Sequence, residues 1–269
     1  MSIQITSLQN PRIKELVRLR ESRRERVSSG KILVEGKDEI RLALAAGHRP
    51  ISLFLAPSLG ASPAELELSA AETQIFTVSE AVFGKVSYRE HPDGYLAVFP
   101  LPQRKMEELH GRSWDFVLVL EGIEKPGNLG AILRSADAAG VEAVLLCDPR
   151  LDPWNPNVVR ASRGALFAVP LYPLSNQEAL SFLREQGLRI LAAMPQGNVL
   201  YHALDLTQPL AWVLGTEDKG LSPFWQEACD ERVVIPMSGR VNSLNVSVAA
   251  AILLFETIRQ RTSAKRARF

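Results

Sequence analysis

The sequence predicts an α/β protein with two domains, and three observations support this prediction. Its 269 residues are enough for one large domain or two smaller ones, with ample material for a buried core. Short apolar runs alternate with helical patterns along the chain. In the second half these runs are apolar on both faces, which is typical of a parallel sheet covered by helices on both sides.

Residues 1–100 are expected to form a small α/β domain. A basic helix from Pro11 to about residue 26 precedes the strand KILVEG, and the following helix, DEIRLALAAG, ends at Gly47. A further helix begins near Ser79, and the remaining strands are ISLFLAP, QIFTVS and GYLAVFP. The segment 101–113 has no long apolar run and is the expected linker.

Residues 114–262 are expected to form the second domain, followed by a disordered basic tail at 263–269. The predicted strands are FVLVLEG, AVLLCD, LFAVPLY, LRILAAM, AWVLGTE and VVIPM. The predicted helices cover 129–139, 157–165, 176–187 and 246–260. In parallel sheets ligands bind beyond the carboxyl ends of the strands. We therefore expect the chemistry in the turns after VLVLEG, WVLGTE and VVIPM.

Composition excludes several classes of protein. The apolar fraction of 46% and the charged fraction of 23% are those of an ordinary globular protein. There is no apolar run of membrane-spanning length and no signal-peptide pattern, so a cytoplasmic protein without membrane contact is expected. The two cysteines lie far apart, and the four histidines lack metal-ligand spacing. Neither a disulfide nor a metal site is expected.

Positive charge is concentrated near the N-terminus. Between Arg12 and Lys31 there are eight Lys or Arg residues and three Glu residues, although the net charge of the whole chain is only +1. Such a cluster is expected where a protein contacts a phosphate backbone. A solvated helix face with Glu–Arg pairs explains it equally well. The candidate nucleic-acid contacts are Arg12, Lys14, Arg18, Arg23, Arg24 and Lys37.

The first polar turn, EGIEKPGNLGAILRSADAAGV, follows a strand and is rich in glycine, as are many nucleotide sites. The dinucleotide fingerprint needs glycines at relative positions 1, 3 and 6, whereas Gly122, Gly127 and Gly130 fall at 1, 6 and 9. The Walker spacing is present, but Asn128 and Leu129 replace its Lys and Ser or Thr. Both fingerprints fail, which disfavours a nucleotide-dependent dehydrogenase or phosphotransferase.

The other two turns carry polar side chains at strand ends. In LGTEDKGLSPFW, Leu221 stands where a Walker loop has lysine, and Glu217 is either a site carboxylate or a helix cap. In IPMSGRVNSLNVSVAAAI, three polar residues precede a helix: Asn242, Ser243 and Asn245. One residue suffices to cap a helix, so the cluster favours binding.

Three segments carry a specific resemblance. NLGAILRSADAAG, LGTEDKGLS and IPMSGRVNSLNVSVAAAI resemble, in order and spacing, the motifs of the SpoU (TrmH-type) RNA ribose 2'-O-methyltransferases of the SPOUT superfamily, over about residues 115–260. SLQNPRIKEL and KILVEG resemble the substrate-binding domain of ribosomal RNA members. The resemblance implies an N-terminal RNA-binding domain, a C-terminal deep trefoil knot, S-adenosylmethionine held in the knot, and a homodimer with active sites at its interface.

The resemblance also implies the roles of particular residues. The cofactor pocket would be lined by Gly215, Ile235 and Leu244. The catalytic residues would be Asn128, Arg134, Glu217, Ser243 and Asn245. The expected reaction is methylation of a ribose 2'-hydroxyl in structured RNA, with 23S-type ribosomal RNA as the leading substrate. Transfer RNA as the substrate, or a non-catalytic RNA-binding or ribosome assembly factor, are the alternatives.

Overall fold

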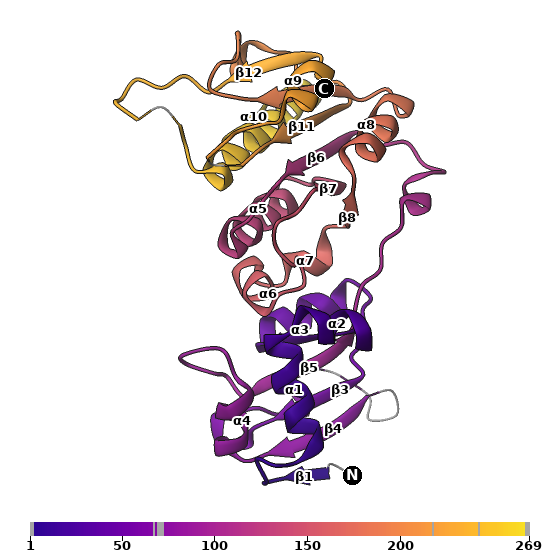
Figure 1. The fold of residues 1–269 in the computed structure, drawn as a ribbon, viewed down its shortest axis with the longest axis vertical. Coiled ribbons are helices and arrows are strands. Elements are labelled where there is room, and N and C mark those ends of the chain that lie inside the picture. The colour runs from indigo at the N-terminus through magenta and orange to yellow at the C-terminus, as the bar shows by residue number, and fades with distance from the viewer. Residues whose placement is uncertain (1–2, 67, 69–72, 217, 242, 267–269) are drawn as a thin grey trace. The chain divides into compact units, whose positions relative to one another are not determined.

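The computed structural model describes residues 3–66, 68, 73–216, 218–241 and 243–266. The chain divides into two compact units, which are described separately (Figure 1). The first unit combines the residues up to Gln103 with the segment Asp152–Ala168, and the second combines Arg104–Leu151 with the chain from Val169 onward.

In the described part of the first unit, five strands form one sheet in the order β1-β4-β3-β5-β2. The strands are β1 (Ile3–Ile5), β2 (Lys31–Glu35), β3 (Ser52–Leu55), β4 (Gln74–Val78) and β5 (Tyr95–Pro100). The helices are α1 (Pro11–Glu21), α2 (Arg23–Ser29), α3 (Lys37–Ala45), α4 (Glu80–Val86), α6 (Pro156–Ser162) and α7 (Ala165–Ala168), with the short 3₁₀ turns η1 (Pro57–Leu59) and η2 (Pro63–Leu66). β5 runs antiparallel to β2 and β3, whereas β1, β4 and β3 are parallel. Apolar side chains of α1 and α4 pack on this sheet to form its core.

The basic helix expected as one element is two helices. The chain leaves helical geometry at Ser22, whose φ and ψ are −116° and 115°. The Ser22 side chain accepts a hydrogen bond from the Glu25 backbone N–H, so it caps α2. The prediction of one continuous helix missed this break at Ser22.

The segment Asp152–Ala168 leaves the second half of the chain and packs in the first unit. Arg26 is 2% exposed, and its Nε and Nη2 donate to Asp152 Oδ2 at 2.8 and 2.6 Å. Gly164 has a φ of +86°, and an added Cβ would lie 3.1 Å from the Glu39 Cα, so glycine is required there. The domain boundaries expected from the sequence did not assign this segment to the first domain.

The strand predicted for LFAVPLY is largely wrong. Residues Ala165–Ala168 form α7, which packs against α3, and the strand begins only at Leu171, after Pro170. An apolar run of this length fits a buried helical turn as well as a strand, and periodicity alone does not separate the two.

In the described part of the second unit, a seven-stranded parallel sheet has the order β10-β12-β9-β11-β6-β7-β8. The strands are β6 (Phe116–Glu121), β7 (Ala143–Cys147), β8 (Leu171–Leu174), β9 (Arg189–Ala193), β10 (Val199–Leu200), β11 (Leu210–Leu214) and β12 (Glu231–Val234). The helices are α5 (Pro126–Ala138), α8 (Asn176–Glu185), α9 (Pro223–Ala228) and α10 (Val246–Arg266), with the 3₁₀ turns η3 (Met106–Leu109) and η4 (Tyr201–Ala203). The predicted α/β class and parallel sheet are confirmed.

Helices cover both faces of this sheet, as the apolar strands require. α10 packs along α5 and against β11, while α8 and α9 pack against β7 and β9. Within α10, Thr257 is fully buried and accepts a hydrogen bond at 3.0 Å from the Trp212 indole N–H. Because β6 lies between β11 and β7, the carboxyl ends of strands far apart in sequence meet at one edge.

The C-terminal segment differs from the prediction of a disordered tail. α10 continues to Arg266, and only residues 267–269 of the expected tail lie outside the described chain. Arg261 anchors the last turns, since its Nη1 donates to Asp115 Oδ2 at 2.6 Å and its Nε to the Leu206 carbonyl. None of the described helices is long and apolar enough to cross a membrane.

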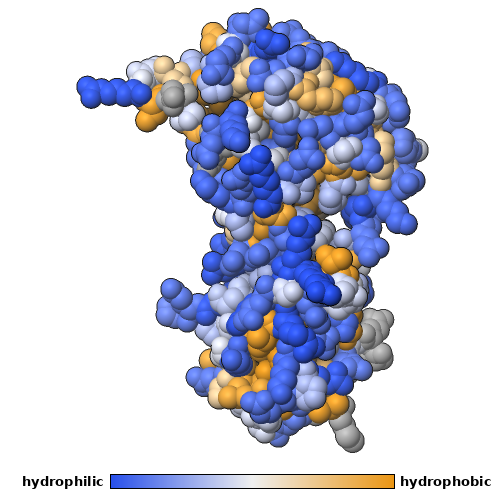
Figure 2. Space-filling view, viewed as in Figure 1, coloured by the Kyte–Doolittle hydropathy of each residue, from blue (hydrophilic) through white to orange (hydrophobic). Residues whose placement is uncertain are grey.

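A long loop from Ile235 to Asn245 joins β12 to α10 and projects from the second unit (Figure 1). Figure 2 shows hydrophobic as well as hydrophilic atoms on this loop. Val241 is 65% exposed and Met237 is 37% exposed. The loop therefore presents apolar surface beside the edge of the sheet at which the predicted site lies.

Candidate functional site

The turns after β6 and β11 meet at the carboxyl edge of the parallel sheet, as the sequence predicted. Gly122, directly after β6, has a φ of +66°, and an added Cβ would lie 2.9 Å from the Thr216 Cγ2. An added Cβ on Gly215 would overlap the Gly220 carbonyl. The backbones of Thr216 and Gly220 exchange two hydrogen bonds of 3.1 Å each. Glycine is therefore needed where these two turns approach each other and where the second turn folds back.

A cavity of about 520 Å³ lies between the second and third turns and the end of β9. All three residues predicted for the cofactor pocket line it: Gly215, Ile235 and Leu244. Ser243, predicted as catalytic, also lines the cavity. The volume falls in the range of about 300–1,000 Å³ that small-molecule sites occupy. Apolar side chains and polar groups both contribute to the wall.

A smaller pocket of about 30 Å³ shares Thr216, Asp218 and Val246 with the cavity and is also lined by Asn128 and Lys125. This pocket connects the first turn to the larger cavity.

Asn245 links the first and third turns. Its Nδ2 donates to the Asn128 Oδ1 at 3.2 Å, while its Oδ1 accepts from the Ser247 backbone N–H at 2.9 Å and from the Ser247 hydroxyl at 2.6 Å. Asn245 thus serves as a helix cap and also reaches the first turn. The helix-capping role that the sequence left open is therefore present, and the contact with Asn128 places Asn245 beside the first turn.

The structure describes only one of the remaining two predicted catalytic residues. Arg134 lies on an exposed part of α5 and lines neither pocket. Among the described residues, no ion pair or hydrogen bond of its side chain is found. Glu217 lies outside the described residues. No described group of three or more His, Cys, Asp or Glu residues could hold a metal ion.

Sequence reasoning missed a buried polar network behind the turns. Glu121 ends β6 and is 7% exposed, and its carboxylate accepts hydrogen bonds from Ser222 and from Asn176. Asn176 in turn accepts a 2.7 Å bond from the fully buried Trp225 indole and donates to Asp148. The available signal was a single carboxylate at the end of the otherwise apolar strand FVLVLE.

The predicted RNA contacts in the first unit fall into two groups. Lys14, Arg23 and Arg24 are exposed, and no described carboxylate lies within ion-pair distance of them. Arg12 likewise lacks a described carboxylate partner, and its guanidinium lies 4.6 Å from the centre of the Phe76 ring. The other two candidates, Arg18 and Lys37, form ion pairs. The Arg18 pair with Glu25, at 3.4 Å, is of the kind that the alternative interpretation expected.

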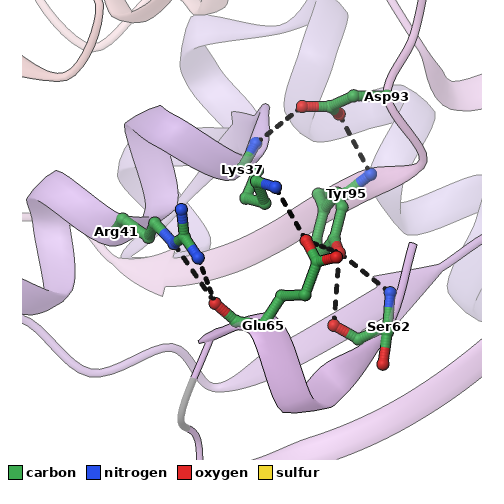
Figure 3. A network of polar contacts seen from close by, with 6 residues as sticks. All are labelled: Lys37, Arg41, Ser62, Glu65, Asp93 and Tyr95. Atoms are coloured by element: carbon green, nitrogen blue, oxygen red, sulfur yellow. Dashed lines mark hydrogen bonds and ion pairs between the residues drawn. The ribbon is translucent and has the colours of Figure 1, made fainter. Parts of the chain in front are cut away.

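Lys37 belongs to a polar network at the start of α3 (Figure 3). Its Nζ lies 2.7 Å from the Glu65 Oε2, which also accepts a 2.9 Å hydrogen bond from the Tyr95 hydroxyl. The contact with Glu65 raises the pKa of the Lys37 ammonium. The Asp93 carboxylate accepts hydrogen bonds from the backbone N–H groups of Lys37 and Tyr95. The Lys37 charge is therefore already matched within the protein.

Comparisons with known proteins match both halves of the chain. Residues 115–255 match the SpoU rRNA Methylase family, and residues 10–97 match the MRM3-like substrate binding domain. A 23S rRNA (guanosine-2'-O-)-methyltransferase, RlmB from Nitrosomonas europaea, is 46% identical over 147 residues, which are 54% of this chain and 56% of that protein.

Two solved structures match nearly the whole chain. An RNA 2'-O ribose methyltransferase is 42% identical, with a TM-score of 0.83 over 97% of this chain and 100% of its own. The SpoU methyltransferase AviRb from Streptomyces viridochromogenes, solved with AdoMet, is 28% identical, with a TM-score of 0.85 over 95% of this chain and 99% of its own. Together with the family match over more than half of the sequence, they show that this chain belongs to the SpoU rRNA methylase family.

Proposed function

We propose that the protein transfers a methyl group from S-adenosylmethionine to a ribose 2'-hydroxyl of structured RNA, with ribosomal RNA as the substrate. The observation that carries the proposal is the cavity of about 520 Å³ at the carboxyl edge of the parallel sheet, next to the linked Asn128 and Asn245. The family description and the RlmB relative name ribosomal RNA, and the AviRb structure names the methyl donor.

The cavity fits this donor in size and in the character of its wall. Gly215, Ile235 and Leu244 would hold S-adenosylmethionine, largely through backbone groups, and Ser243 lies beside them. When bound, the donor supplies an electrophilic methyl group on a sulfonium. The protein must then align a ribose hydroxyl with that methyl and assist loss of the hydroxyl proton.

Asn128 and Asn245 are proposed to orient the ribose at the smaller pocket, where the first and third turns are joined. Glu217 belongs to the same proposed constellation. Arg134 is proposed to bind a phosphate of the target and to stabilise the developing alkoxide. A guanidinium keeps its proton, with a pKa above about 12, so we do not assign Arg134 as the general base.

The proposal includes a homodimer with the active sites at its interface. Two observations support it: Arg134 lines neither pocket of its own chain, and α10, which packs along α5, exposes Val248 (47%) and Phe255 (48%). An apolar surface of this kind is often covered by a partner. In such a dimer, Arg134 would complete the site of the second copy. A trefoil-knotted C-terminal backbone and a cytoplasmic location are also part of the proposal.

The reaction is tested by incubating the purified protein with S-adenosylmethionine labelled on its methyl group and with ribosomal or transfer RNA. We expect label in ribosomal RNA at alkali-resistant linkages, because a methylated 2'-oxygen cannot attack the neighbouring phosphate. Label in transfer RNA alone would support the first alternative. RNA binding without any methyl transfer would support a non-catalytic assembly factor.

Arg134→Lys and Arg134→Ala separate the possible roles of the arginine. If Arg134 acts as a point charge, lysine restores part of the rate lost with alanine; equal loss in both indicates a need for the planar guanidinium. Arg184→Ala, on α8 at the other face of the sheet, is the control and should retain activity. Asn245→Ala should fold and lose most methyl transfer, and unchanged activity would remove Asn245 from the site.

Ligand-induced stabilisation tests the class of cofactor. S-adenosylhomocysteine should raise the melting temperature, because a ligand that binds only the folded state stabilises it. NAD and ATP should have no effect, given the failed glycine fingerprints. Stabilisation by NAD or ATP alone would contradict the proposed function.

A further inference from the structure

Glu121 is a buried carboxylate to which the proposed reaction assigns no role. It ends β6 at the carboxyl edge of the sheet and is 7% exposed. Among the residues that the structure describes, no cation lies within ion-pair distance of its side chain. A buried carboxylate without a cation is costly unless hydrogen bonds satisfy it. The donors around Glu121 therefore indicate what the side chain does.

Three hydrogen bonds satisfy Glu121, and two of them come from one residue. The Ser222 backbone N–H donates to Oε2 at 2.8 Å, and the Ser222 hydroxyl donates to Oε1 at 2.6 Å. The third donor is the Asn176 side-chain amide, at 2.9 Å from Oε1. Hydrogen bonds to an ionised acceptor are shorter and stronger than neutral ones. Glu121 thus clamps Ser222 from both its backbone and its side chain.

Ser222 is the return end of the turn that lines the cofactor cavity. The turn starts at Gly215, directly after β11, folds back through the paired backbones of Thr216 and Gly220, and reaches Ser222 two residues later. The start of the turn is fixed by the β11 ladder. The return end has Glu121 as its link to β6, so the position of the cavity wall depends on this carboxylate.

A second contact makes the same connection one residue along the chain. Gly122 follows Glu121 and lies so close to Thr216 that an added Cβ would come within 2.9 Å of it. The carboxylate is itself held in place from behind, since Trp225 and Asp148 fix the Asn176 amide. Glu121 is therefore a rigid anchor rather than a mobile surface acid.

We propose that Glu121 is a positioning residue that acts through Ser222 to hold the turn 215–222 in the shape that binds S-adenosylmethionine. The inference rests on the proposed function of the cavity. Glu121 lines neither pocket, so its effect falls on cofactor affinity and not on the chemical step.

Glu121→Gln is the test substitution, because it keeps the size of the side chain but replaces an acceptor oxygen with an amide that faces donors. We expect S-adenosylhomocysteine to bind about tenfold more weakly, which corresponds to about 1.4 kcal/mol. The KM for S-adenosylmethionine should rise by a similar factor. The KM for RNA, and kcat at saturating cofactor, should stay within about threefold of the wild-type values.

Two further variants separate positioning from general destabilisation. Ser222→Ala should weaken S-adenosylhomocysteine binding by about threefold, and the double variant should bind no more weakly than Glu121→Gln, because both changes remove one shared contact. Glu178→Gln is the matched control: this exposed glutamate caps α8 through Ser175 and does not contact the turn. It should lower the melting temperature without changing the KM for the cofactor.

Isothermal titration calorimetry of the wild-type protein comes first. If the wild type neither binds S-adenosylhomocysteine nor methylates RNA, the proposed function is wrong, and this inference falls with it. If the wild type binds and a folded Glu121→Gln variant binds equally well, only the inference is overturned. If Glu178→Gln loses as much affinity for S-adenosylhomocysteine as Glu121→Gln does, the inference is overturned as well. If Glu121→Gln does not fold, Ser222→Ala decides, and unchanged affinity in that variant refutes the positioning role.

Discussion

Asp152→Asn is expected to lower the free energy of unfolding of the first unit by about 3 kcal/mol. Asp152 Oδ2 accepts hydrogen bonds from both Nε and Nη2 of Arg26. The remaining nitrogen, Nη1, donates to the Leu19 carbonyl at 2.6 Å. The side chains of the pair are only 3% and 10% exposed. Asparagine would keep the acceptor for the Trp154 backbone N–H but leave the buried guanidinium without its counter-charge.

The magnitude follows from burial. Removing one partner of a buried ion pair costs about 3–5 kcal/mol, whereas exposed pairs contribute about 0–1 kcal/mol. Glu25→Gln is the control, because its pair with Arg18 lies in the same region with side chains 56% and 30% exposed. That variant should lose less than about 1 kcal/mol. The double variant Arg26→Met/Asp152→Leu should recover much of the loss, since neither charge remains unpaired.

Equilibrium urea unfolding measures these differences. Trp154 lies beside Asp152, and the other three tryptophans of the chain, Trp114, Trp212 and Trp225, belong to the second unit. Hydrogen exchange of peptides from α6 and α2 assigns the loss to the first unit. A loss for Asp152→Asn no larger than that for Glu25→Gln would refute the argument that this buried pair holds the segment in place.

Three further predictions concern charge and burial. Burial raises the pKa of Glu35, so the stability that its carboxyl group contributes is present below the ordinary pKa of 4.5 and is lost as pH rises through the higher folded value. Glu35→Gln should therefore gain stability relative to the wild type as pH rises above 4.5, which urea unfolding measures, and a difference that stays constant with pH would contradict this. Burial also raises the pKa of the Cys147 thiol, which should resist a disulfide reagent until the second unit unfolds; rapid labelling of the native protein at Cys147 would contradict this. The double variant Arg23→Ala/Arg24→Ala should lower RNA affinity and reduce the slope of log affinity against log salt concentration by about one to two units. Lys37→Met should change this slope less, because Lys37 is already paired with Glu65. Equal changes of slope in the two variants would show that the pairing does not matter.

Much of the second unit could be predicted because its strands are continuous apolar runs bounded by turn residues. The runs ending in Glu121, Cys147 and Leu214 became strands within one to three residues of the expected bounds. The segment 152–168 could not be assigned, because local patterns show that a helix is apolar on one side but not which sheet it covers. The extension of α10 to Arg266 was missed for a similar reason: its anchor is a contact of Arg261 with the distant Asp115.

Residues predicted for the candidate site lie together where a motif fixes backbone shape. Gly215 and Leu244 line the cavity as expected, and Asn245 reaches Asn128. The sequence could not show that Arg134 lines neither pocket, because a position on a helix does not specify what that face meets. Glu121 was missed because its partners are more than fifty residues away along the chain, at a distance no local pattern encodes.

The strand order of the second unit governs how the protein can fold during synthesis. β6 is made early, yet one of its two neighbours, β11, follows about ninety residues later. At about 5–20 residues per second, that edge of β6 stays unpaired for several seconds while the intervening chain emerges. An apolar strand with an open edge is prone to pair with the wrong partner. The arrangement that brings the three turns together thus leaves one edge of β6 open until β11 has been made.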